Sequence, residues 1–384
     1  MPTTKLKNNI YRMMLPFFAP PCSRHPLKPV IGRNINNPHA LVSLLRRHHV
    51  QGAALLLSDQ EQKSIICSES ALPGHEACIS TYFRVASITK TATAVLAMRF
   101  AEEKIFELEK PVRSFFPSLP YDRTLDDITL KHLLSHTSGL IDPPCLESSL
   151  EKGVPFTDLL HDAQLFKPGD SFHYSNLGYG LIGSIMESVT DKPVGQIFRQ
   201  YLFEPLQMNA TLEGCLLPRD KIMPVTRVLP YHKDHDLILT PLGSSPLSSP
   251  DPYHHYGHTA GSMYTDILSL QKLFDILRMN HSRFLSGASV NAMKHKYASY
   301  GKISPALSYG FGLLRINDPY ISDSLVLGHQ GFAYGCADGA FWEEKTGRMM
   351  IMLNGGASEA RNGRLGCLNR DLLHWAFREE IPSW

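Results

Sequence analysis

Short apolar runs separated by polar turns lie near both ends of this chain and predict β-strands there. Such runs fade in the long middle of the chain. There, apolar residues recur every three to four positions between loops marked by Pro and Gly, a pattern typical of amphipathic helices. The predicted strands cover 52–57, 64–67, 81–86, 324–327, 335–343 and 348–354, and the predicted helices cover 38–48, 91–105, 128–134, 180–189, 196–202, 265–279 and 362–377.

Because strands lie at both ends with helices between them, we expect an α/β (α+β) fold whose single sheet is assembled from both ends of the chain. A mostly helical domain would be inserted between the two parts. The expected division is a discontinuous α/β domain over 38–105 and 285–384 with an inserted helical domain over 106–284. Residues 1–37 are rich in Pro and Asn, and we expect them to form a loosely ordered arm.

Composition places the chain among ordinary globular proteins. It has 384 residues, of which 43% are hydrophobic and 19% charged, and its formal net charge is +2. This balance gives no reason to expect a nucleic-acid partner, and no basic stripe interleaved with aromatics is present. No apolar run approaches the length that a membrane span needs.

The N-terminus and the cysteines bear on location and cofactors. Residues 8–21 contain Asn, Arg and several prolines, and they offer no apolar core or small-residue cleavage site of a signal peptide. Pro20 and Pro21 precede Cys22, where a lipidation signal needs small residues. Seven scattered cysteines form neither a disulfide framework nor a zinc pattern. We therefore expect a cytoplasmic protein with reduced thiols, no metal and no organic cofactor.

Ser87 and Lys90 form the most informative pair in the chain. A serine hydroxyl needs a neighbouring base to become a nucleophile. Residues three apart on a helix share one face, so the Lys90 amine can reach the Ser87 oxygen. Since residues 81–86 read as a strand and 91–105 as a helix, Ser87 is expected at a helix N-terminus, where developing negative charge is favoured. We assign Ser87 as the nucleophile and Lys90 as the group that takes its proton.

Two further boxes follow Ser87 in order along the chain. Residues 174–176 read Tyr-Ser-Asn, and residues 329–331 read His-Gln-Gly after a strand-like run. Ser-x-x-Lys, a polar triplet and a basic-x-Gly triplet are the parts of serine β-lactamase and penicillin-binding-protein sites. With these middle and third boxes the set resembles the class C β-lactamase-related family, which also holds esterases, D-amino-acid peptidases and acyltransferases.

Two more stretches carry the resemblance. Residues 136–140 (His-Thr-Ser-Gly-Leu) and 205–208 (Pro-Leu-Gln-Met) resemble further elements of the family, and the likeness runs from about 38 to 377. It implies an antiparallel sheet flanked by helices, with the site in the cleft between the domains.

The resemblance also implies roles for single residues. Tyr174 would protonate the leaving group and activate water, and Asn176 would hydrogen-bond Lys90 or the acyl amide of the substrate. Ser175 is interpreted as a small spacer. His329 and Gly331 would line the opposite wall, where Gly331 lets the backbone approach the substrate without a Cβ atom in the way. The N–H groups of Phe332 and Ser87 would form the oxyanion hole.

Several similar patterns are interpreted as structural. Ser269 and Lys272 repeat the Ser-x-x-Lys spacing within an amphipathic pattern and read as a solvated helix face. A literal Lys-Thr-Gly at 345–347 lies between two apolar strands and reads as a hairpin turn. The His-Tyr-Gly at 255–257 lies in a Pro- and Ser-rich loop whose histidines have no acidic partner in the pattern, so no metal site is expected there. His132 and His136 are interpreted as structural, and no Gly-x-Ser-x-Gly elbow is present.

The third box bears on the substrate. Cephalosporinases of the family usually carry Lys there, whereas His329 is mostly uncharged at neutral pH. The sequence therefore favours neutral acyl groups over strong β-lactamase activity. We expect a serine hydrolase that acts through a Ser87 acyl-enzyme on small esters, amides or peptides. An acyltransferase or weak β-lactamase remains an alternative, and so does a penicillin-binding or scaffold protein without turnover.

Overall fold

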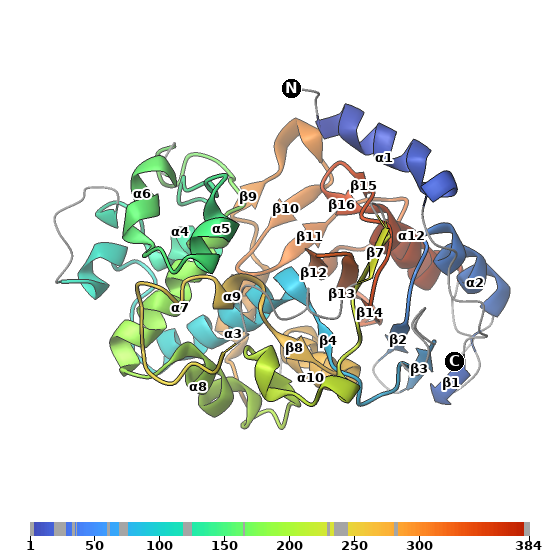
Figure 1. Ribbon diagram of the computed structural model, residues 1–384, viewed down its shortest axis with the longest axis horizontal. Coiled ribbons are helices and arrows are strands. Elements are labelled where there is room, and N and C mark those ends of the chain that lie inside the picture. The colour runs from blue at the N-terminus through green and yellow to red at the C-terminus, as the bar shows by residue number, and fades with distance from the viewer. Residues whose placement is uncertain are drawn as a thin grey trace.

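A nine-stranded antiparallel sheet forms the centre of the computed structural model (Figure 1). The structure describes residues 4–18, 28–32, 35, 37–59, 62–68, 76–117, 125–163, 166–228, 231–233, 245–279 and 283–379. The strand order is β1 (Lys28–Ile31), β3 (Lys63–Cys67), β2 (Ala53–Ser58), β14 (Met349–Asn354), β13 (Cys336–Glu343), β12 (Val326–Ala333), β11 (Leu314–Ile316), β10 (Leu307–Tyr309) and β9 (Ala298–Ser299).

Both ends of the chain contribute to this sheet, as the sequence pattern predicts. β1, β2 and β3 come from the N-terminal part, and β9 to β14 come from the C-terminal part. The predicted fold class is confirmed. The predicted strand over 81–86 is wrong in extent, because only β4 (Phe83–Arg84) forms, and it joins β8 (Tyr264–Thr265) and β5 (Ala210–Thr211) in a small separate sheet.

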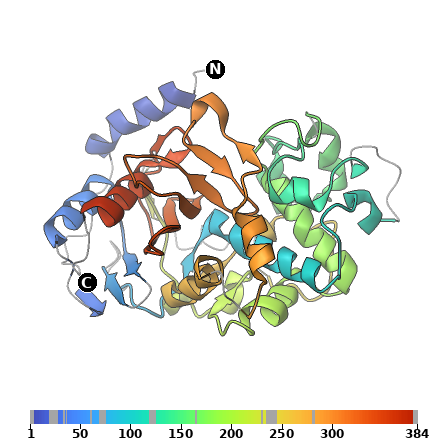
Figure 2. The same ribbon diagram turned by 180° about the vertical axis from the view of Figure 1, so that it is seen from behind.

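Helices cover both faces of the large sheet (Figures 1 and 2). One face packs against α2 (Pro38–Arg47) and α12 (Cys367–His374), and the other packs against α10 (Ile267–Arg278). Along β14, Met350 and Met352 pack in the core that includes α2 and α12, while Ile351 and Leu353 pack in the core that includes α10. This strand therefore reads as a continuous apolar run because both of its faces are buried.

The remaining helices lie between the two parts of the sheet in sequence. α3 (Thr89–Glu102) is buried from Thr89 to Met98, and its Ala and Thr residues let α7 (Asn176–Thr190) and α9 (His258–Gly261) pack closely. The other helices of this region are α4 (Leu130–Leu134), α5 (Leu146–Glu151), α6 (Thr157–Ala163) and α8 (Val194–Phe198), and α11 (Gly287–Lys294) follows them.

Two features bear on the expected organisation. The region expected as a loosely ordered arm, 1–37, contains helix α1 (Thr4–Phe18) and strand β1, which pairs with β3. Helix α10, which lies in the part assigned to the inserted helical domain, packs against β2, β13 and β14 of the sheet. The division into an arm and two domains stays a prediction.

Among the described helices, none has both the length and the apolar character that crossing a bilayer requires.

Candidate active site

Ser87 lies in a tight turn where the small sheet meets the central helix. The turn is the 3-10 segment η1 (Ala86–Ile88), directly between β4 and α3. Ala86 adopts φ 46°, a left-handed conformation that costs a residue with a Cβ atom about 1 kcal/mol. A Cβ atom on Gly331 would lie 2.2 Å from the Val85 carbonyl oxygen, so β12 approaches this turn more closely than any side chain allows. The lack of a Cβ atom on Gly331 thus allows backbone packing against the turn that carries Ser87, and the expected approach of the substrate to Gly331 stays a prediction.

Lys90 lies one turn further along, as expected, with its amine 3.1 Å from the Ser87 Oγ. It is fully buried. Its Nζ also donates to Asn176 Oδ1 at 2.8 Å and to the Ala260 carbonyl oxygen at 2.7 Å. Burial lowers the pKa of Lys90 from 10.5 to about 7, although the nearby Asp142 carboxylate opposes the shift. A large fraction of this amine is therefore neutral at physiological pH.

Tyr174 completes the group around Ser87. The two residues line the same cavity, and the Lys90 Nζ lies 4.9 Å from the centre of the Tyr174 ring. Burial raises the pKa of Tyr174 well above its usual value, and the neighbouring Ser87 hydroxyl opposes this only in part. The phenol consequently keeps its proton at neutral pH and is available as an acid.

Asp142 organises the Tyr-Ser-Asn box, and the sequence analysis missed it. Its carboxylate accepts hydrogen bonds from Asn176 Nδ2 at 2.7 Å, Ser175 Oγ at 3.0 Å and the Leu177 N–H at 3.0 Å. Ser175 also caps α7 by accepting from the Gly178 N–H at 3.0 Å, so it is more than the spacer we expected. The only sequence signal for Asp142 is its place two residues after the 136–140 element.

His136 lies inside the site rather than at its edge. It adopts φ 57°, and its Nδ1 accepts from the Ser175 N–H at 3.1 Å. The centres of the His136 and Tyr174 rings are 4.2 Å apart. These contacts fit the structural role that we predict for His136, in support of the Tyr-Ser-Asn segment at 174–176. His132 caps α4 by accepting from the Thr129 N–H, which agrees with its structural interpretation.

His329 lies on β12, where burial keeps its imidazole neutral. A carbonyl oxygen only accepts, so the Nδ1–H group must donate to the Gln330 oxygen at 2.7 Å. Nε2 is then unprotonated and accepts from the Tyr309 hydroxyl at 2.8 Å. Burial, together with the charge of Lys90, lowers the pKa of His329 to about 3. The third box therefore brings no cation to the site.

Two arginines near the C-terminal end bring the positive charge that His329 lacks. Arg361 lies in β15 (Arg361–Asn362), and its guanidinium carbon lies 4.2 Å from the centre of the Phe332 ring. Arg364 follows in the turn before β16 (Leu365–Gly366). The Gln330 amide holds this turn by donating to the Arg364 carbonyl oxygen at 2.7 Å and accepting from the Gly366 N–H at 3.0 Å. The sequence analysis did not single out either arginine.

Ser87 opens onto two adjoining cavities. The first, the Tyr174 cavity, has a volume of about 620 Å³, and the second, the Tyr334 cavity, has about 540 Å³. Ser87, Asn176, Phe332 and Arg361 line both. The Tyr174 cavity is also lined by Tyr174, Tyr300, His329 and Arg364, and the Tyr334 cavity by Arg84, Glu147, Tyr256, Tyr334 and Glu359.

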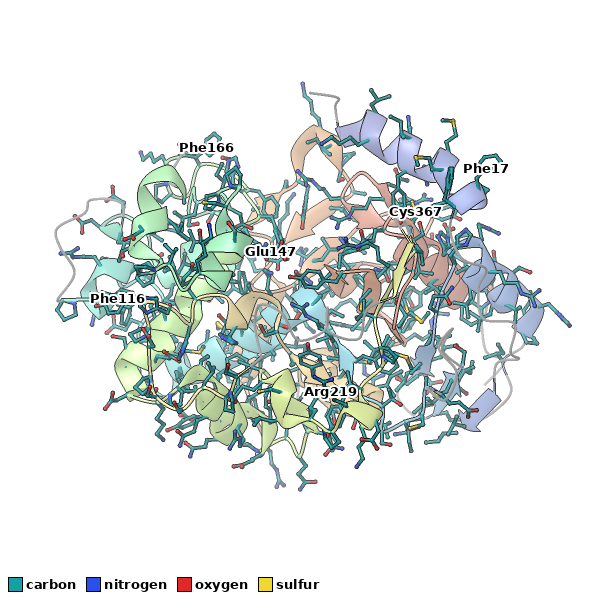
Figure 3. All side chains as sticks on the ribbon, in the orientation of Figure 1. Phe17, Phe116, Glu147, Phe166, Arg219 and Cys367 are labelled. Atoms are coloured by element: carbon teal, nitrogen blue, oxygen red, sulfur yellow. The ribbon has the colours of Figure 1, made fainter. Side chains whose placement is uncertain are left out.

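A side-chain link crosses the rim of the Tyr334 cavity. Tyr334, in the turn between β12 and β13, donates its hydroxyl to Glu147 of α5, which Figure 3 shows on the helical side of the molecule. Below it, the Arg84 guanidinium carbon lies 4.7 Å from the centre of the Tyr334 ring. The cleft therefore lies between the sheet and the helices, as the resemblance implied.

The structure also places the patterns that were set aside. Gly347 of the Lys-Thr-Gly triplet adopts φ 72° in the β13–β14 turn, as predicted. Ser269 is buried and accepts from the Asn209 N–H, so only Lys272 of that pair fits the predicted solvated face. His255 does have an acidic partner, Glu187 at 2.8 Å, contrary to our expectation. Even so, the described residues contain no cluster of three or more His, Cys, Asp or Glu suited to a metal ion.

Curated relatives match part of the chain. Protein flp of Staphylococcus aureus (strain MW2) is 28% identical over 200 residues, which cover 50% of this chain and 38% of that protein. Penicillin-binding protein 4* of Bacillus subtilis (strain 168) is 29% identical over 141 residues, or 34% of this chain and 30% of that one. The chain thus spans less than two fifths of the length of these relatives.

Solved structures match the fold over most of the chain. EstCE1, a hydrolase with promiscuous acyltransferase activity, superposes with a TM-score of 0.70 at 20% identity over 87% of this chain and 97% of that one. A D-stereospecific amidohydrolase from Streptomyces sp. gives a TM-score of 0.65 at 24% identity over 86% and 95%. The family model described as Beta-lactamase matches residues 44–364. Since this match covers most of the sequence, the chain belongs to the beta-lactamase family.

Proposed function

We propose that this protein is a serine hydrolase that forms an acyl-enzyme on Ser87. The observation that carries the proposal is the buried Lys90 amine, 3.1 Å from the Ser87 oxygen and with a pKa of about 7. A partly neutral amine at this distance can accept the hydroxyl proton as the serine attacks a carbonyl carbon. The position of Ser87 at the start of α3 supports the expectation that its N–H, with that of Phe332, stabilises the resulting oxyanion.

Tyr174 is the proposed proton donor to the leaving group. Its phenol is protonated at neutral pH and lines the same cavity as Ser87. When the tetrahedral intermediate collapses, the bond to the leaving group breaks and Tyr174 supplies the proton, which the protonated Lys90 then replaces. In the second half of the cycle water attacks the acyl carbon and gives a proton to the neutral Lys90. The bond between the acyl carbon and the Ser87 oxygen then breaks, the acid leaves, and Lys90 returns the proton to Ser87.

Tyr174, the proposed proton donor, lines one of the two cavities and is absent from the other. We therefore assign the leaving group to the Tyr174 cavity and the acyl group to the Tyr334 cavity. Arg364 lines only the leaving-group cavity, Arg361 lines both cavities, and guanidinium groups favour carboxylates. We therefore propose esters and amides whose leaving group carries a carboxylate as the preferred substrates. The sequence predicts a preference for neutral acyl groups and leaves the leaving group open. The proposed preference for a carboxylate in the leaving group rests on the cations of β15 and its following turn, since the third box supplies none.

Hydrolysis of p-nitrophenyl esters by wild type, Ser87→Ala and Ser248→Ala tests the proposal. Ser248 is exposed and lies outside both cavities, so its variant controls for handling and folding. We expect the Ser87 variant to lose all but about 10⁻³ of the activity and the Ser248 variant to keep it. Equal rates for wild type and Ser87→Ala would contradict the proposal. A single turnover without release would favour a penicillin-binding or scaffold protein, and product analysis with a competing alcohol would reveal acyl transfer.

A further inference from the structure

Helix α1 turns its apolar side away from the protein. Residues 6, 10, 13, 14 and 17 are Leu, Ile, Met, Met and Phe, spaced so that they form one stripe along the helix. Met13 is 67% exposed and Phe17 is 79% exposed. We call these five side chains the α1 stripe. Six of the twelve exposed large hydrophobic side chains in the described part of the chain belong to this one helix, so the stripe is a concentrated patch and not scattered surface.

The opposite side of α1 holds the helix on the protein. Leu15 is buried, and Tyr11 accepts a hydrogen bond from the Glu359 N–H at 3.1 Å. Arg12 donates to the Cys367 Sγ at 2.8 Å. Figures 1 and 2 show α1 at the periphery of the molecule, and Figure 3 shows Phe17 at its outer edge. Since the helix is docked through this side, the stripe is left facing solvent.

Charge identifies the kind of partner that the α1 stripe fits. Within α1 the charged residues are Lys5, Lys7 and Arg12, and there is no Asp or Glu. Residues 1–58 contain eight Lys and Arg and no acidic residue, whereas the rest of the chain has 30 Lys and Arg against 36 Asp and Glu. A partner for the α1 stripe and the basic residues around it should carry negative charge and should also offer an apolar environment to the exposed side chains. Anionic lipid offers both, whereas nucleic acid offers only the charge.

We propose that the α1 stripe docks the protein onto the surface of an anionic lipid bilayer. The helix would lie in the plane of the interface, with Ile10, Met13 and Phe17 in the acyl boundary and Lys7 near the headgroups. Because Tyr11, Arg12 and Leu15 tie the helix to the protein, docking through the α1 stripe would bring the whole protein to the membrane surface. The inference does not depend on the proposed chemistry at Ser87.

Vesicle co-sedimentation of the full chain tests this inference. The vesicles are phosphatidylcholine alone, or phosphatidylcholine with about one third phosphatidylserine. We expect binding to the anionic vesicles that falls with added salt, and at least about tenfold weaker binding for Met13→Ser/Phe17→Ser. Met279→Ser is the matched control, since Met279 is 51% exposed at the end of α10, and it should bind like wild type.

Thermal unfolding separates docking from folding. The substituted side chains are exposed, so the midpoints of all variants should match that of wild type. Three results would overturn the inference: no binding to anionic vesicles, equal binding to both kinds of vesicle, or equal binding by the double variant. A solution dimer that the double variant abolishes would likewise overturn it, because a second copy of the chain would then cover the stripe.

Discussion

The Lys90 amine donates to Asn176 Oδ1 at 2.8 Å and to the Ala260 carbonyl oxygen at 2.7 Å. Both acceptors are carbonyl oxygens, and a neutral amine has only two N–H groups and one lone pair. When Lys90 is neutral, these bonds use both N–H groups and leave the lone pair for the Ser87 hydroxyl at 3.1 Å. The environment of Lys90 therefore sets both its protonation state and the direction in which it acts as a base.

The pH dependence of the reaction follows from this arrangement. The pKa of Lys90 is lowered from 10.5 to about 7, so the amine is protonated and inactive as a base below pH 7. We expect kcat/KM for a neutral ester to rise about tenfold per pH unit below 7 and to level off above it. Rate profiles between pH 5 and about 9 check this. Lys90→Met should lose most of the activity and also the rise of kcat/KM with pH below 7. Lys272→Met replaces the exposed lysine of the Ser269/Lys272 pair and should retain the wild-type profile. A flat profile in wild type would argue against Lys90 as the base.

Asp142 is expected to act as a positioning residue through Asn176 and Lys90. Its charge raises the pKa of Lys90, so Asp142→Asn should lower that pKa further and move the acid limb to lower pH. The variant also places an amide N–H₂ among three donors, and we expect kcat to fall about tenfold or more. Asp158→Asn, on the exposed side of α6, is the control. If kcat fell while kcat/KM rose over the same pH range as in wild type, the Asp142 carboxylate would have only a structural role.

The two arginines beside the Tyr174 cavity should discriminate between leaving groups. Arg361→Gln and Arg364→Gln are each expected to raise KM about tenfold for an ester with a carboxylated leaving group, since each loses a charge-assisted contact. A neutral ester of the same acyl group should be affected little. Both substrates are measured side by side at one pH. Equal effects on the two substrates would place the role of these residues in folding rather than in recognition.

Gly331 offers a test of the packing behind the nucleophile. In Gly331→Ala the new Cβ would lie 2.2 Å from the Val85 oxygen, so β12 or the turn must shift, at a cost of about 1–3 kcal/mol in unfolding free energy. Gly178→Ala is the matched control, because a Cβ there meets only contacts of 3.5 Å or more. Denaturant unfolding of both variants checks the expectation, and a Gly331 variant as stable as wild type would show that the turn tolerates the side chain.

The site residues that belong to short sequence motifs could be predicted from the sequence. The Ser-x-x-Lys spacing fixes Lys90 beside Ser87 through helix geometry alone, and β14 is apolar enough to be recognised as a strand. The role of Asp142 was not predicted, because its hydrogen-bond partners lie more than 30 residues away in the sequence and the residues around it form no motif that points to them. The place of Arg361 and Arg364 in the site was not predicted either, because it depends on tertiary contacts between the 361–366 segment and β12. Helix α1 was not predicted, because Pro and Asn are frequent in residues 1–37 and both favour loops over helix interiors.

Covalent labelling of the nucleophile tests the central claim most directly. The full chain is treated with a fluorophosphonate, and the adduct is measured by intact mass and located by peptide mapping, in wild type, Lys90→Met and Ser87→Ala. The account requires one adduct on Ser87 in wild type, much slower labelling in Lys90→Met and none in Ser87→Ala. An adduct on any other residue, or equal labelling of wild type and Lys90→Met, would contradict it.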